Sequence, residues 1–346
     1  MLRQAVNELI VTVEIRGQSF VLVKDGRYEK PAGDDRLPAF VFVSRTPPER
    51  LLEVVRGAVL SGRPMPFYIP GSSVRGAWRS YLEKVLRSLD EPEHAKVCDP
   101  HIAPTEVEDA VEEIPEDDPY ASCSGYLVNR ELPHPAEAYK LSCPVCQLFG
   151  NTAQGSRLAF EDAEFHGGNA SVMDNVAISR QTGSVIAPFK SLGIRDAKFA
   201  LKLRLRNFEL WQLGLLARLF GDLGAGRAPL GSGKNKGWGR IEASATEIEL
   251  SYFGLEDAIG DGKLRGIGDV PGADLSRYGM SRAATLPGMD LPVDAGKSSL
   301  WRHTRVIANI PEFWEKTKPC FDAQVWRNFR TLSARRALVE VPSAGA

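Results

Sequence analysis

The sequence contains little of several things that would mark other classes of protein. It has only five cysteines in 346 residues, and so small and odd a number excludes a disulfide-stapled scaffold. No stretch approaches the uninterrupted apolar length of a membrane span, and the first residues lack the apolar centre of a signal peptide. We therefore expect a cytoplasmic protein that has no membrane partner.

The chain also lacks an excess of charge of either sign. Its formal net charge is -1, with 43 Lys and Arg against 44 Asp and Glu. A generally basic surface is thereby excluded, so any nucleic-acid binding must come from clustered cations. The distribution of charge along the chain is therefore more informative than its sum.

The order of apolar patterns predicts an α+β fold. Alternation at 9–15, 19–24, 39–43, 157–165, 197–208 and 240–252 is typical of strands, while 47–61, 73–89 and 209–223 have helical spacing. Strands and helices in this sequence favour a ferredoxin-like sheet with its helices on one face. Residues 90–150 are an insertion, because acidic residues and prolines crowd 107–120.

Two stretches carry candidate phosphate-binding residues. Pro70-Gly71 is followed by Ser72 and Ser73 at the start of the second helix, where unpaired N–H groups favour an anion. A simple helix cap is the other interpretation of these serines. Arg75 and Arg79 are four residues apart and share one helical face.

The second stretch is the glycine-rich loop at 231–240, GSGKNKGWGR. Its four glycines allow a close approach of the backbone, and Lys234 and Lys236 supply charge. Trp238 offers either a base-stacking surface or a wedge into the core. The loop matches neither a Walker motif nor a dinucleotide-binding fingerprint.

The clustered cysteines suggest a structural metal site. Cys143-x-x-Cys146 and Cys98-x-x-His101 have the spacing of two zinc-ligand pairs. Cys123 and His134 compete for single positions in this set. A zinc ion would hold an insertion that has little core of its own, and buried unligated thiols are the alternative.

The motifs together resemble the RAMP superfamily, and most closely the backbone subunits of type III CRISPR effector complexes. The resemblance rests on IPGSSVRGAWR (69–79), CPVCQLFG (143–150), SRLAFEDA (156–163), ISRQTG (178–183) and the glycine loop, in this order. It covers about residues 5–250. It implies a core over 1–250 of modified RRM type, with a zinc-containing insertion at 90–150 and a β-hairpin thumb at 175–195, and leaves 251–346 as a C-terminal extension.

The resemblance also implies roles for particular residues. Guide-RNA phosphates would be held by Ser72, Ser73, Arg75, Arg79, Arg180, Lys234, Asn235 and Lys236. The apolar tip of the thumb would be Val185, Ile186 or Phe189, although Phe189 is equally well explained by core packing. The implied partners are guide RNA, target RNA and other RAMP-type subunits.

An enzymatic role depends on a pair of aspartates. Asp34 and Asp35 lie between the first strand and the helix-start motif, where the subunits that cleave target RNA carry a catalytic aspartate. They would orient an attacking hydroxyl or bind a divalent metal such as Mg. Adjacent aspartates in a turn are also ordinary surface residues. A metal-dependent endoribonuclease that processes precursor guide RNA, and a stand-alone RNA-binding protein, are the alternative functions.

Overall fold

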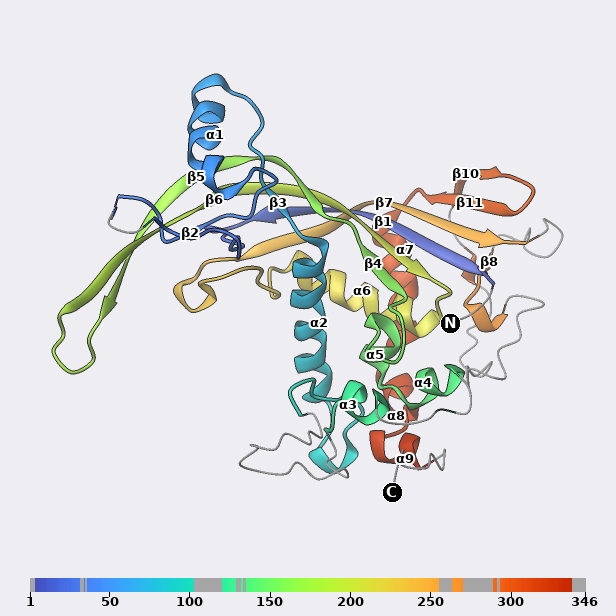
Figure 1. Ribbon diagram of the computed structural model, residues 1–346. Coiled ribbons are helices and arrows are strands. Elements are labelled where there is room, and N and C mark those ends of the chain that lie inside the picture. Colours follow the sequence, from blue (N-terminus) through green and yellow to red (C-terminus); the bar gives the residue numbers. More distant parts are fainter. Residues whose placement is uncertain are drawn as a thin grey trace.

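The computed structural model describes residues 4–31, 34, 36–102, 120–128, 132, 135–254, 263–269, 289–290 and 293–337. Within them one mixed sheet forms the centre of the molecule, and most of the helices lie on one side of it (Figure 1). Among these residues, no helix is both long enough and apolar enough to serve as a membrane span.

Four long strands form the middle of the sheet, and all their pairings are antiparallel. Their spatial order is β7-β1-β6-β5. The strands are β1 (Asn7–Gly17), β5 (Ala163–Ile178), β6 (Val185–Arg206) and β7 (Ile241–Phe253).

Two helices connect these strands in the βαββαβ order of a ferredoxin-like unit. Helix α2 (Gly71–Arg87) comes between β1 and β5, and α6 (Leu210–Gly224) comes between β6 and β7. The α+β fold expected from the sequence is therefore confirmed, and the four central strands of its sheet are antiparallel.

Alternation along the central strands determines which face the helices cover. In β1, Leu9, Val11, Val13 and Ile15 are buried in the main core. The residues between them point to the opposite face, because neighbouring side chains of a strand alternate. Helix α2 buries Val74, Trp78 and Leu82 at intervals of four residues, and this apolar stripe packs against the same core.

Shorter elements extend or cover the sheet. Helix α1 (Pro48–Ser61) lies above the sheet in Figure 1, on the side of the β5–β6 hairpin. The short strands that pair with β5 and β6 are β2 (Phe40–Val41), β3 (Tyr68–Ile69) and β4 (Leu158–Phe160). The insertion carries α3 (Cys123–Val128), α4 (Pro135–Leu141) and α5 (Pro144–Phe149).

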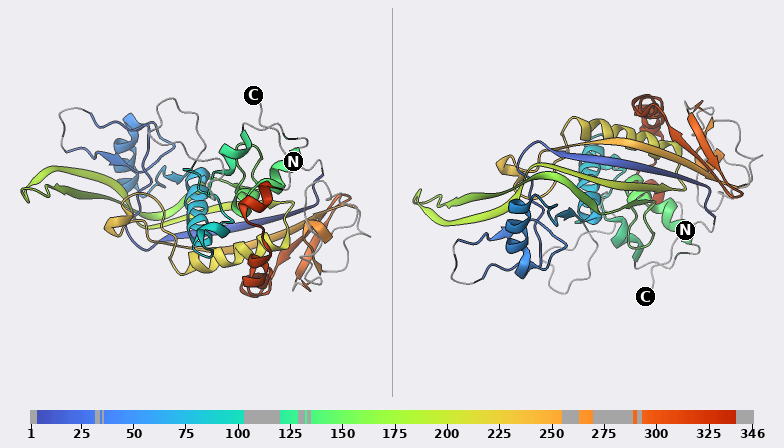
Figure 2. Two further views of the ribbon diagram at one scale, coloured as in Figure 1. Left: turned by 90° about the horizontal axis from the view of Figure 1, so that it is seen from below. Right: turned by 90° about the horizontal axis from the view of Figure 1, so that it is seen from above.

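The hairpin of β5 and β6 projects well beyond the rest of the sheet (Figures 1 and 2). Its two strands pair from Glu164 and Ala200 out to Ile178 and Val185. In this region the sequence pattern predicts strands only at 157–165 and 197–208. The outer part, where Gly167, Gly168 and Pro188 interrupt the alternation, was expected only from the resemblance.

The described part of the C-terminal region is packed into the same structure. Strand β11 (Arg302–Ile307) pairs with β7, and β10 (Val293–Ser298) pairs with β11. The helices that follow, and the 3-10 turn Lys318–Phe321 between them, contribute Phe313, Phe321 and Leu332 to the main core. They are α7 (Ile310–Thr317), α8 (Ala323–Asn328) and α9 (Leu332–Arg336). This region therefore widens the sheet and covers the helical layer.

Candidate metal centre and nucleic-acid interface

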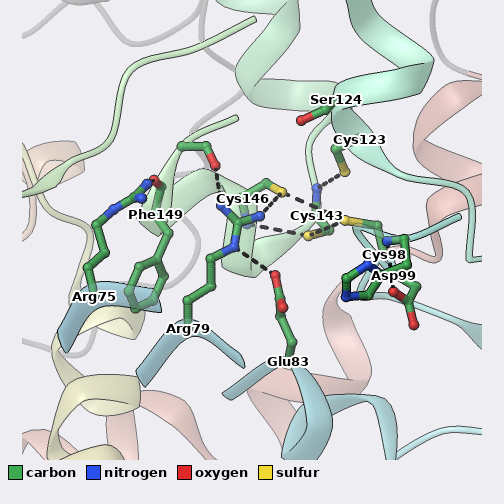
Figure 3. A network of polar contacts seen from close by, with 12 residues as sticks. Arg75, Arg79, Glu83, Cys98, Asp99, Cys123, Ser124, Cys143, Cys146 and Phe149 are labelled. Atoms are coloured by element: carbon green, nitrogen blue, oxygen red, sulfur yellow. Dashed lines mark hydrogen bonds and ion pairs between the residues drawn. The ribbon is translucent and has the colours of Figure 1, made fainter. Parts of the chain in front are cut away.

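Four buried cysteines meet beside α2 (Figure 3). The sulfur atoms of Cys98, Cys123, Cys143 and Cys146 all lie within 4.8 Å of one another. The Cys98 sulfur is 3.7 Å from both the Cys143 and the Cys146 sulfur. Zinc–sulfur bonds of about 2.3 Å in a tetrahedron place the sulfurs about 3.8 Å apart, so this set of thiols fits a metal ion.

Neighbouring donors are directed at the sulfurs. The Cys146 N–H points at the Cys143 sulfur at 3.3 Å, because Cys143 caps the first turn of α5. The Cys143 N–H points at the Cys123 sulfur at 3.2 Å. The Arg79 guanidinium donates to the Cys146 sulfur at 3.2 Å. Such donors stabilise negative charge on thiolates, as outer-shell partners of metal ligands do.

The thiols also perturb one another's protonation. Hydrogen bonds from neighbouring thiols raise the pKa of Cys98 and of Cys123. Burial alone would raise the pKa of Cys143, but hydrogen bonds from the other three thiols hold it well below its ordinary value. Of the four thiols, Cys143 is thus the one whose surroundings favour the thiolate. A metal ion allows all four to ionise and releases protons as it binds.

The structure changes one predicted ligand. Cys123 takes the fourth position, which the Cys-x-x-His spacing assigns to His101. His101 is exposed, and its backbone N–H donates to the Asp99 side chain in a local turn. His134, the other competitor, lies outside the described residues. Cys123 was a possible ligand from the sequence, but no spacing signal could select it, because it is 20 or more residues from the other three.

The start of α2 is held by an acidic residue from the β4–β5 connection. The Gly71 N–H donates to Asp162 Oδ1 at 2.9 Å. A Cβ at Gly71 would lie 2.5 Å from the Phe160 carbonyl oxygen, so only glycine fits here. Ser72 is exposed and Ser73 half-buried, and neither hydroxyl makes a hydrogen bond to another described residue. The simple capping role is therefore not what these serines do.

The two arginines of α2 point into the molecule. Arg79 pairs with the buried Glu83 at 2.7 Å and donates to the Gly150 carbonyl at 2.9 Å. Arg75 donates to the Phe149 carbonyl oxygen. Arg79 therefore contacts the CPVC knuckle (143–146), and both arginines contact the end of the segment that follows it (Figure 3). In this structure they hold the four-cysteine cluster and α5 against α2, whereas the resemblance implies that they bind phosphates.

The glycine loop is attached to the N-terminal part of the chain. The Ser232 N–H donates to the Leu22 carbonyl at 2.7 Å, and the Gly239 N–H donates to the Phe20 carbonyl at 2.8 Å. Gly239 has a φ of 72°, and a Cβ there would lie 2.2 Å from the Leu230 oxygen. Trp238 packs edge-on against Phe20 with ring centres 4.6 Å apart. Of its two interpretations, the wedge into the core is the one observed.

The cations of this loop differ in their contacts. Lys236 donates to Asn175 of the hairpin at 3.1 Å, and its ammonium lies 5.1 Å from the centre of the Phe189 ring. Lys234 and Asn235 are exposed. Lys236 thus joins the loop to the base of the hairpin, while the two residues before it face solvent.

Near its tip, the hairpin carries exposed apolar side chains on both sides of the polar turn at 179–184. Val185 and Ile186 are 56% and 66% exposed, and Ile178 is 61% exposed. Arg180, in the turn between the strands, is also exposed. Phe189 instead packs against Phe40, with ring centres 5.8 Å apart. Phe189 therefore has a packing role, and the exposed apolar residues near the tip are the other three.

The candidate catalytic pair is only partly described. Asp34 is half-buried, and its carboxylate accepts the Arg36 N–H at 2.9 Å, which closes a turn. Asp35 lies outside the described residues. The described cluster that fits a metal consists of the four cysteines and does not include Asp34.

Comparison with known proteins gives one finding. A search of curated proteins returned no match. The family model of the RAMP superfamily matches residues 66–242, just over half of the 346 residues. The match begins before β3 and ends at the start of β7, so it includes the start of α2, the CPVC knuckle, the hairpin and the glycine loop. The chain belongs to the RAMP superfamily, whose members are CRISPR-associated RNA-binding proteins.

Proposed function

We propose that this protein is a guide-RNA-binding backbone subunit of a type III CRISPR effector complex. The observation that carries the proposal is the joining of the glycine loop to the hairpin. Lys236 bonds Asn175, so the exposed Lys234 and Asn235 lie at the base of a projecting hairpin with exposed apolar residues near its tip. This arrangement offers cations to an RNA backbone beside a wedge that separates bases.

A series of backbone hydrogen bonds connects the glycine loop with the start of α2, the two parts of the proposed phosphate-binding surface. It runs from Ser232 to Leu22, from Val43 to Val23 at 2.8 Å, and from Tyr68 to Val43 at 3.5 Å. Tyr68 begins β3, which leads directly into α2. The glycine loop and Ser72 at the helix start are thus connected through one continuous layer. In this proposal Ser72, Ser73, Lys234 and Asn235 bind guide phosphates, and Arg180 binds RNA near the tip.

The test of phosphate binding is the retention of RNA by the full chain. The variant Lys234→Ala/Asn235→Ala should bind single-stranded RNA more weakly than the wild type. The slope of log K against log salt should fall by about 0.7, because the variant removes one pairing of a lysine with a phosphate. Lys318→Ala, which removes an exposed lysine paired with Glu315, is the matched control. Equal slopes for both variants would contradict the proposed site.

The role of the thumb has its own test. Val185→Ser/Ile186→Ser alters exposed residues, so stability should change by no more than about 0.5 kcal/mol. Target-RNA binding by the assembled complex should weaken, while guide retention stays unchanged. Val172→Ser is the control, because Val172 is 53% exposed on the side of the hairpin.

A purified chain that cuts precursor RNA without partners would instead support the alternative function, a processing endoribonuclease.

We include target cleavage in the proposal through Asp34, and zinc as the ion of the four-cysteine site. Asp34 lies between β1 and α2, as the resemblance requires. Asp34→Ala should abolish target cleavage by the reconstituted complex and leave its assembly intact. Unchanged cleavage would restrict this residue to closing its turn.

A further inference from the structure

The face of the sheet opposite α2 and α6 carries a buried acid at one end. Glu8 alternates with the core residues Leu9 and Val11 of β1, so it points away from the helices. Its side chain is nonetheless only 3% exposed. It lies opposite Arg206 of β6 and Ser251 of β7, at the end of the sheet away from the hairpin tip.

Three arginines surround this carboxylate. Arg206 Nε donates to Oε1 at 3.0 Å, Arg302 Nη2 donates to Oε2 at 3.3 Å, and Arg204 Nη1 lies 3.7 Å from Oε1. Their side chains are 63%, 42% and 34% exposed, respectively. One buried negative charge therefore holds three guanidinium groups, and the cluster retains a net charge of two positive units.

The arrangement orients the arginines, and most of their donors make no hydrogen bond to the part of the chain that the structure describes. A guanidinium has five N–H donors in a rigid plane, and the two carboxylate oxygens accept only a few of them. Arg302 is further fixed because it lies over the Phe253 ring, 4.8 Å from its centre. Guanidinium groups held in this way are suited to bind the oxygens of a phosphate.

The surrounding face favours a phosphate backbone over stacked bases. On β6, Lys198 and Lys202 continue the cationic column, and neither has an ion-pair partner among the described residues. On the same face of β1 and β6, the uncharged residues include Ile10, Thr12 and Ala200, and the one further acid of β1, Glu14, pairs there with Arg16 at 2.8 Å. Neither strand has an aromatic ring there on which a base could stack. Glu247 and Glu249 confine the positive region to the β6 side of β1.

We propose that the Glu8–Arg204–Arg206–Arg302 cluster binds two neighbouring phosphate groups of the RNA that this protein carries. The proposal rests on the proposed RNA-binding function and extends it to the open face of the sheet. The described helices α2, α6 and α7 all lie on the other side of the sheet, while α1 lies above it near the hairpin (Figures 1 and 2). Among the described residues, no helix covers the end of this face where the cluster lies.

The experiment compares salt-dependent RNA binding by full-chain variants. The probe is a fluorescently labelled single-stranded RNA. Arg206→Ala/Arg302→Ala should reduce the slope of log K against log salt by about 1.4, or about 0.7 for each arginine that no longer neutralises a phosphate. Arg227→Ala is the control for charge, because Arg227 is 67% exposed and pairs with Asp222 away from this face. Its slope should equal that of the wild type.

A second variant guards against misfolding. Arg206→Ala alone leaves Glu8 paired with Arg204 and Arg302, so it should fold normally and reduce the slope by about half as much. A slope unchanged in both arginine variants, with RNA binding intact in the wild type, would overturn the phosphate site alone. If an arginine variant loses a protein that co-purifies with the wild type, while its salt slope for RNA binding is unchanged, the phosphate site would also be overturned, in favour of an acidic protein partner. A wild type that binds no RNA would refute the proposed function itself.

Discussion

Replacement of Cys123 by serine tests both the presence of the metal and the identity of its ligands. The four cysteines belong to three separate segments: the chain after α2, the start of α3, and the CPVC knuckle. An ion shared by them is a cross-link that closes loops of about 25 and 20 residues. In the insertion, α5 and Tyr139 pack into the main core, while Tyr126, Leu127, Ala138 and Leu141 form a small separate cluster.

The expected loss of stability follows from these loop lengths. A cross-link that closes a loop of about 25 residues contributes about 3 kcal/mol. An unfolding entropy of about 2.1 cal/mol/K per residue gives about 0.7 kcal/mol/K for the whole chain. Cys123→Ser should therefore lower the melting temperature by about 4 °C and reduce the bound zinc. His101→Ala should change neither, because its side chain is exposed and outside the sulfur cluster.

The measurements are elemental analysis of the purified full chain and differential scanning calorimetry. Wild-type protein should contain one zinc ion per chain, and a strong chelator should reproduce the destabilisation of Cys123→Ser. Wild-type protein that contains no metal would refute the metal centre. Zinc lost from His101→Ala but retained by Cys123→Ser would refute this ligand set and restore the Cys-x-x-His pair.

Three further predictions concern the framework. Glu83→Ala removes the carboxylate partner of the half-buried Arg79 and should lower the free energy of unfolding by about 1.5–3 kcal/mol in a urea titration. A change below about 1 kcal/mol would show that solvent or the Gly150 and Cys146 partners of Arg79 compensate for the loss. Gly71→Ala should prevent normal folding, because its new Cβ would overlap backbone atoms. Gly76→Ala should stabilise α2 by up to about 1 kcal/mol, because no atom lies within 4 Å of the new Cβ there. Similar effects on stability at both sites would contradict the close packing of Gly71. Hydrogen bonds from Arg27 lower the pKa of Asp25 in the folded protein. The ionised Asp25 therefore stabilises the fold above the pKa of an unfolded aspartate, and this stability is lost as the pH falls through the folded-state pKa. Asp25→Asn should make the free energy of unfolding depend less on pH in the acid range, and an unchanged pH dependence would refute this role of Asp25.

The core of the fold could be predicted from the sequence because local periodicity determines it. Alternation in β1 and helical spacing in α2 depend only on which residues face the core. The outer hairpin lacks such a signal, because its apolar residues, such as Val176, Ile178 and Val185, are exposed and do not mark a side that faces the core. The pairing of β11 with β7 could not be predicted either, because an added edge strand depends on contacts between distant segments.

In the candidate site, too, local spacing predicted some features, and contacts between distant segments determine the others. Spacing identified the knuckle at Cys143 and Cys146, but Cys123 joins it only through the folded insertion. For Arg79, the four-residue spacing correctly placed it on one helical face with Arg75. The spacing could not show that the insertion covers the helical face that carries Arg75 and Arg79. That face adjoins the buried residues Val74 and Trp78, and the contacts of Arg79 with Cys146 and Gly150 form only in the folded protein.

The position of Arg79 connects the proposed metal centre with the proposed phosphate-binding site at the start of α2. Helix α2 presents Ser72 at its start and holds the four-cysteine cluster and α5 through Arg75 and Arg79 in its first half. The metal centre therefore lies against the same helix that is proposed to bind a phosphate. Because a rigid scaffold positions a binding site more accurately than a loop does, removal of the metal should weaken RNA binding without removing any RNA contact. In the chelated protein this effect should be measured as lower affinity at an unchanged salt slope, since the number of phosphate contacts stays the same.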